Sequence, residues 1–239
     1  MKKMIMFFLL VSLSAFGFKI DDITFDQSLN SGYREYKVYN DSNKKIRYKV
    51  NVSNGKNEKV DVSKMVKVYP KVLSIEPRSF AILKVFGNSK EKLEKREYVF
   101  NLGFTPVIVP TIKKDKDKDK ISGSTFIRLA PQIEMAGYGG NIDWSKSFEV
   151  KGLDLKKSSD EKSLEGTITV ENKAYSGLSV GIKLYDEHMN TMDSVSLGRV
   201  AKEKVSTIKI KINNFKNVKE IKKIVFYKEE MGDIAEVDI

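Results

Sequence analysis

The chain reads Arg34-Glu35-Tyr36-Lys37-Val38-Tyr39 near its start, and this stretch indicates the fold. Polar and apolar side chains alternate through it, which is typical of a β-strand with one buried face. The cluster Asn40-Asp41-Ser42-Asn43 follows at once and predicts a turn. The alternation resumes at residues 46–52, and Asn54-Gly55 ends it. The beginning of the chain is therefore predicted to form short strands separated by turns.

The same pattern continues through the rest of the first half. A turn is predicted at Glu76-Pro77-Arg78-Ser79. Residues 90–95 lack apolar periodicity of their own and leave room for a short helical turn. Strands at such short and regular spacing favour a β-sandwich. The further strands predicted in this half are residues 66–70, 73–75, 80–86 and 98–104.

The second half repeats the strand pattern without repeating the sequence. Met135-Ala136-Gly137-Tyr138-Gly139-Gly140 is interpreted as a hinge between domains. The predicted fold class is therefore all-β, with one β-sandwich domain at residues 18–134 and a second at residues 135–239. The strands predicted in the second domain are residues 148–155, 164–171, 178–185, 195–200, 205–212, 221–227 and 234–239.

The N-terminus predicts export from the cytoplasm. Lys2 and Lys3 precede an apolar run at residues 4–13, which has the length of a signal-peptide core and is short for a membrane span. Ala15-Phe16-Gly17 places small residues at the two positions that a signal peptidase recognises. Residues 1–17 are thus predicted to be a cleaved signal peptide, and an uncleaved anchor is the alternative. No later apolar run is long enough to span, so the mature chain is not expected to insert into a membrane.

The charge of the chain is basic, with a formal net charge of +11. Removal of Lys2 and Lys3 with the signal peptide leaves +9. A basic chain is often a nucleic-acid binder, but export argues against that class of partner. The excess charge is expected to aid solubility and to attract partners that end in a carboxylate.

The sequence nominates no catalytic residue and no metal or cofactor site. His188 is the one histidine, it lies in the predicted turn at residues 185–190, and the chain has no cysteine. A Cys nucleophile or a zinc cluster therefore lacks its usual parts. Lysines interleave Asp115, Asp117 and Asp119 and cancel the field that calcium would need. No P-loop or dinucleotide fingerprint follows a strand. Nothing in the sequence selects a pair of carboxylates for glycoside hydrolysis.

A charged segment precedes the last strand of the first half. Residues 113–120 alternate Lys and Asp and are predicted to be a solvated loop. Ile121-Ser122-Gly123-Ser124-Thr125-Phe126-Ile127-Arg128-Leu129-Ala130-Pro131 then has the character of a strand that ends at a cation, Arg128. A guanidinium beside a strand edge can hold a carboxylate through two hydrogen bonds. The combination is typical of proteins that bind other proteins by adding a strand.

Five segments of the chain form a recognisable series. They are residues 36–41 (a strand and an Asn-containing turn), Val68-Tyr69-Pro70-Lys71-Val72-Leu73-Ser74-Ile75-Glu76-Pro77 (a strand with two prolines), residues 83–85 (a basic strand), residues 95–102 with Pro106 (an acidic residue, an aromatic strand and a proline) and Ile127-Arg128-Leu129 before Pro131. In this order and spacing they resemble the PapD-like family of periplasmic pilus chaperones, in which the first segment is the second strand and the last is the end of the donor strand. The resemblance covers residues 18–131, and the second half matches only in length and strand pattern.

The resemblance implies a chaperone of the periplasm that is not an enzyme. It implies two immunoglobulin-like domains in a boomerang arrangement. The chaperone would bind pilus or fimbrial subunits that lack their own last strand, and its donor strand would fill the open groove of the subunit. Neither catalysis nor a cofactor is implied. Whether an outer-membrane usher takes part is left open.

The resemblance also implies roles for individual residues. Arg128 matches the cation that holds the subunit's terminal carboxylate, and Thr24 stands where the family has a second cation. A different lysine replaces that charge, or the clamp has one cation. Lys84 and Glu97 match a basic and an acidic position that pair near the domain interface. The donor positions on one face of the last strand are Ile121, Gly123, Thr125 and Ile127.

The donor positions depart from the family's run of bulky apolar residues, because Gly123 has no side chain and Thr125 is only partly apolar. Three explanations remain open: a shallow subunit groove, a shifted register, or a contribution from Val107-Ile108-Val109. The alternative function is an exported two-domain β-sandwich adhesin or surface structural protein. That function requires a retention device, and the sequence shows neither a lipobox cysteine nor a sorting tail.

Overall fold

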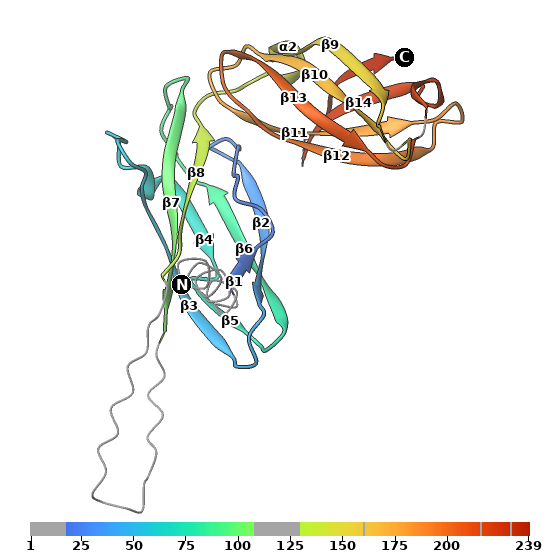
Figure 1. Cartoon of the computed structure of the whole chain (residues 1–239). Coiled ribbons are helices and arrows are strands. Elements are labelled where there is room, and N and C mark those ends of the chain that lie inside the picture. The colour runs from blue at the N-terminus through green and yellow to red at the C-terminus, as the bar shows by residue number, and fades with distance from the viewer. Residues whose placement is uncertain (1–17, 108–129, 160, 216, 230) are drawn as a thin grey trace, which may run out of the picture. The chain divides into compact units, whose positions relative to one another are not determined.

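The computed structural model describes residues 18–107, 130–159, 161–215, 217–229 and 231–239, most of them in β-strands (Figure 1). The described residues form two compact units. The second unit comprises Thr24–Asn30, Lys90–Tyr98 and Ala136–Ile239, and the first comprises the remaining described residues. The predicted signal peptide at residues 1–17 lies outside the described part of the chain.

Two four-stranded sheets are built from the strands of the first half. One has the order β1-β2-β6-β4, and β2 pairs antiparallel with both β1 and β6. The other has the order β5-β3-β7-β8, and β3 pairs antiparallel with both β5 and β7. The bounds of these strands are Phe18–Ile20 (β1), Tyr33–Asn40 (β2), Ile46–Asn54 (β3), Val66–Tyr69 (β4), Val72–Ile75 (β5), Ser79–Gly87 (β6), Glu97–Pro106 (β7) and Gln132–Tyr138 (β8), with a 3₁₀ turn at Val62–Lys64 (η1).

The alternation in the sequence accounts for the core of the first unit. In β2 the side chains of Tyr36 and Val38 are fully buried, while their neighbours Glu35 and Lys37 are exposed. The chain passes from β4 in one sheet to β5 in the other through a cis peptide bond at Tyr69–Pro70. The strand orders match the A-B-E-D and C-F-G sheets of immunoglobulin domains. The other fully or nearly fully buried apolar residues of this core include Leu83, Val85, Phe100, Leu102 and Phe104.

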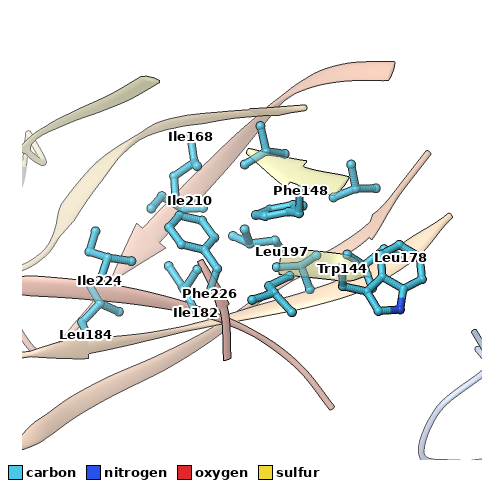
Figure 2. Close-up of a cluster of buried hydrophobic side chains, with 14 of the residues drawn as sticks. Trp144, Phe148, Ile168, Leu178, Ile182, Leu184, Leu197, Ile210, Ile224 and Phe226 are labelled. Carbon is cyan, nitrogen blue, oxygen red and sulfur yellow. The ribbon is translucent and has the colours of Figure 1, made fainter. Parts of the chain in front are cut away.

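The second unit is also a β-sandwich. Its sheets have the orders β13-β10-β9 and β12-β11-β14-β15, and all of these pairs are antiparallel. Apolar side chains from both sheets fill the space between them, as Figure 2 shows for Ile168 and Ile210 on one sheet and Ile182 and Phe226 on the other. The bounds are Phe148–Lys157 (β9), Leu164–Asn172 (β10), Leu178–Tyr185 (β11), Thr191–Val200 (β12), Lys204–Ile212 (β13), Lys223–Lys228 (β14) and Gly232–Asp238 (β15), with short helical turns at Trp144–Ser147 (α2) and Val218–Glu220 (η2).

The predicted fold class is confirmed, and nearly all predicted strands in the described residues are present within a few residues of their expected bounds. The short helical turn expected at residues 90–95 is wrong, because this segment has no helical turn in the structure. Two segments that the sequence assigned to the first domain, residues 24–30 and 90–98, pack with the second unit. The boundary between the units on the C-terminal side falls between Met135 and Ala136.

Residues 135–140, interpreted as a hinge between domains, contain the boundary between the two units, and strand β8 runs through them to Tyr138. The glycine at position 137 serves close packing. A Cβ atom there would lie 2.7 Å from Cδ2 of Leu29, closer than two carbon atoms approach. Gly137 therefore lets a neighbouring segment pack directly on the backbone of β8.

Candidate functional site

The candidate site is the outer edge of β8, the last strand in the order β5-β3-β7-β8. The amide of Phe104 in β7 donates to the carbonyl of Pro131 at 2.9 Å, and the amide of Gly139 donates to the carbonyl of Arg96 at 3.1 Å. Odd-numbered residues of β8 thus direct their backbone groups toward β7. Because the direction alternates along a strand, the even-numbered residues direct theirs outward.

The C-terminal half of this edge is covered by residues 24–30. The amide of Asp26 donates to the carbonyl of Ala136 at 2.8 Å, and the amide of Tyr138 donates to the carbonyl of Gln27 at 3.0 Å. The amide of Leu29 donates to the carbonyl of Tyr138 at 2.9 Å, which completes a parallel bridge. All three bonds use outward groups of even-numbered residues, as the alternation requires.

The N-terminal half of the edge has no partner strand among the described residues. Gln132 and Glu134 are exposed, and among the described residues neither has a backbone partner on the outer side. An open edge of this kind presents N–H and C=O groups that another chain can pair with. Upstream, the chain leads back to Arg128 and the predicted donor positions Ile121, Gly123, Thr125 and Ile127, all of which lie outside the described residues.

A charge cluster lies in the second unit, around Arg199 of β12, whose side chain is 33% exposed. Its Nε atom donates to Oδ1 of Asp26 at 2.9 Å, and its Nη2 atom donates to Oε2 of Glu97 at 2.6 Å. The other carboxylate oxygen of Asp26 accepts from the amide and the hydroxyl of Ser179, at 3.1 and 2.7 Å. The Gly177 amide donates to Glu97 at 2.9 Å. We call these five residues the Arg199 cluster.

The cluster favours the ionised form of Glu97. Burial raises the pKa of Glu97, but the hydrogen bond from the Gly177 amide and the charge of Arg199 outweigh burial, so this pKa lies below its ordinary value. Burial lowers the pKa of Arg199, and the charges of Asp26 and Glu97 reverse that effect and raise it. A Cβ atom at position 177 would lie 2.3 Å from Cζ of Arg199, so a larger residue there would displace the guanidinium.

Lys84 and Glu97, which the family resemblance paired, have different partners in the structure. Lys84 on β6 forms an ion pair with Glu35 on β2 at 3.0 Å, on the exposed face of that sheet. The two positions face each other in the register of β2 and β6. Glu97 belongs to the Arg199 cluster instead. The sequence could not show Arg199 as the partner, because it lies 102 positions away along the chain.

Thr24 lies in the segment that leads from β1 to the edge of β8, and it is half-buried. A cation that the sequence analysis missed lies in this region of the chain. Arg34 of β2 is buried and its Nη2 atom contacts Oδ2 of Asp22 at 2.5 Å. The sequence pattern could have indicated the burial of Arg34, because the alternation places it on the same face of β2 as the buried Tyr36.

Within the described residues, no group of three or more acidic, histidine or cysteine side chains is arranged to hold a metal ion. The same residues include no helix that is long and apolar enough to cross a membrane.

No family model matches the chain, and no curated protein matches its sequence. Solved structures do resemble it. The Pseudomonas aeruginosa CupB2 chaperone is 12% identical, with 92% of this chain and 98% of that chain covered and a TM-score of 0.40. The Escherichia coli chaperone DraB is 11% identical, with 94% and 96% covered and a TM-score of 0.42. The CsuC–CsuE complex of a chaperone and a tip subunit from Acinetobacter baumannii is 15% identical, with 81% and 89% covered and a TM-score of 0.40. These structures are of chaperones, the class that the sequence motifs resemble.

Proposed function

We propose that the protein is a periplasmic chaperone that binds pilus or fimbrial subunits by adding a strand to them before assembly. The observation that carries the proposal is the outer edge of β8 at Gln132 and Glu134, which has no backbone partner in the described part of the chain. This edge directly follows the segment that the sequence predicts as the donor strand. A strand edge and the segment that extends it are what strand addition needs.

Strand addition explains why such a subunit needs a partner. A subunit that lacks its last strand exposes unpaired N–H and C=O groups beside an apolar groove, and such edges aggregate. A donor strand satisfies the backbone groups, and its alternate side chains fill the groove. In this proposal Ile121 and Ile127 supply apolar side chains, and Gly123 and Thr125 face a shallower part of the groove.

Arg128 is the proposed anchor for the subunit's terminal carboxylate, because a guanidinium binds a carboxylate in a fixed geometry. Thr24 is the proposed neighbour that donates one neutral hydrogen bond.

The test is to purify the tagged full-length protein from periplasm of cells that assemble fimbriae, and to identify stoichiometric partners by mass spectrometry. The expected partner is a small exported subunit, and Arg128→Ala is expected to lose most of it. Retention of the subunit by Arg128→Ala would move the anchor to another residue. Recovery of no subunit, with the protein found mainly on the cell surface, would overturn the proposal in favour of a surface structural protein.

A further inference from the structure

Residues 24–30 form a strap that ends the open edge of β8. The strap runs parallel to β8 and occupies the outward backbone groups of Ala136 and Tyr138 through the amides of Asp26 and Leu29 and the carbonyl of Gln27. The outward groups at positions 132 and 134 lie just before it and have no such cover among the described residues. Within the described residues, the edge of β8 is thus divided into an uncovered part up to Glu134 and a covered part from Ala136.

Burial and hydrogen bonds of its side chains hold the strap in place. The side chains of Phe25 and Leu29 are 0% exposed, and Asp26 is 1% exposed. The Asp26 carboxylate accepts three hydrogen bonds, from the amide and hydroxyl of Ser179 and from Nε of Arg199. Releasing the strap would leave this carboxylate without those donors, which is unfavourable for a buried charge.

The backbone at Asp26 suits this role. Its φ of 45° is in the left-handed region, which aspartate adopts more readily than most residues. The amide of Asp26 faces β8 while its side chain faces Ser179 on β11. Asp26 therefore bonds both Ala136 and Ser179, which belong to the same unit as the strap.

We propose that the strap is a fixed stop for an added strand, and that Asp26 is the residue that positions it. The inference rests on the proposed function, since it concerns a strand added at the edge of β8. A partner strand pairs with the edge up to Glu134 and ends or turns away there, because the outward groups of Ala136 and Tyr138 are already bonded. The stop thereby sets the register, since side chains change faces with a slip of one residue.

The test follows the hydrogen exchange of single amides by NMR, in the full mature chain alone and in the co-purified complex with its subunit. The outward amide of Glu134 is expected to exchange slowly only in the complex. The amides of Asp26 and Leu29 are expected to be protected in both samples, because the strap stays in place. Loss of their protection in the complex would overturn the stop. An unchanged Glu134 amide would instead contradict strand addition at this edge, so the two failures are distinguishable.

Two variants are designed to weaken the attachment of the strap to β8 and β11. Asp26→Ala removes the anchor, and Ser179→Ala removes one hydrogen bond to it while the ion pair with Arg199 is kept. In both free proteins the amides of Asp26 (or Ala at that position) and Leu29 are expected to exchange about ten-fold faster. The control is Ser194→Ala on β12, whose hydroxyl pairs with Tyr227 at 3.2 Å and does not bond to the strap. In the Asp26→Ala complex, one more backbone amide of the labelled subunit is expected to become protected; an unchanged number would count against the stop.

Discussion

Arg199 joins two carboxylates that come from segments far apart in the sequence. It lies in β12, while Asp26 belongs to the strap and Glu97 is the first residue of β7. The Asp26 side chain is 2% exposed and that of Glu97 is 13% exposed, so neither has bulk water as a substitute partner. The physical consequence is that loss of the guanidinium leaves two poorly solvated negative charges close together.

Arg199→Ala is expected to lower the free energy of unfolding of the second unit by about 3 kcal/mol. The measurement is urea unfolding followed by the fluorescence of Trp144, the one tryptophan of the chain, which is buried in the core of that unit. The matched control is Lys223→Ala in the same sheet. This change removes an ion pair between Lys223 of β14 and the 64%-exposed Glu236 of β15. The control is expected to cost less than about 1 kcal/mol. Equal effects of the two variants would refute the special role of Arg199.

The same cluster predicts a pH dependence. The pKa of Glu97 is lower in the folded protein than its ordinary value, so the unfolded chain binds more protons in the range between the two values. The stabilisation from Glu97 is therefore complete above its unfolded pKa, about 4.3, and is lost as the pH falls through the folded pKa. In the wild type, the urea concentration at the midpoint of unfolding is expected to fall as the pH drops below about 4.3. In Glu97→Gln this fall is expected to be smaller. A decline as steep as that of the wild type would contradict the assignment.

In both sandwiches, a buried asparagine at the end of the second strand hydrogen-bonds the backbone of the turn that follows. Asn40 ends β2, and its Nδ2 atom donates to the carbonyls of Lys44, Ile75 and Glu76 at 2.8, 3.2 and 3.0 Å. Asn172 ends β10, and its Nδ2 atom donates to the carbonyl of Ser176 at 2.9 Å. Each also accepts an amide two residues later, from Ser42 and Ala174, at 3.0 Å. The two units therefore share a turn device without a visible sequence repeat.

Asn40→Ala is expected to destabilise the first unit by about 2–3 kcal/mol, because buried carbonyls lose their donor. Unfolding of the first unit is measured by hydrogen exchange of the core amides of β2 and β6. Asn43→Ala in the same turn is the control, since Asn43 is exposed and its side chain accepts from Nε of Arg78 at 3.0 Å. A cost at Asn40 as small as that at Asn43 would show that the turn does not depend on the buried amide.

At the scale of the whole molecule, strands were predictable and long-range contacts were not. The period of two at residues 34–39 reflects one buried face, and it needs no knowledge of the rest of the chain. The strap has no such period, because its structure depends on Ser179 and Arg199 more than 150 positions away. Residues 135–140 were interpreted as a hinge from their glycines, and the close contact of Gly137 with Leu29 could not be predicted, because Leu29 is distant in the sequence. The candidate edge was predicted only as far as the donor segment that precedes it.

The most direct measurement compares Glu134→Pro with Glu134→Ala in co-purification of the subunit. Proline removes the outward N–H of β8, and an edge strand accepts proline where that N–H does not face its neighbour. Alanine removes the same exposed side chain and keeps the N–H. Both variants are expected to keep the native Trp144 fluorescence. Glu134→Pro is expected to retain about ten-fold less subunit, and Glu134→Ala to retain the wild-type amount. Equal retention by both variants would contradict strand addition at the edge of β8.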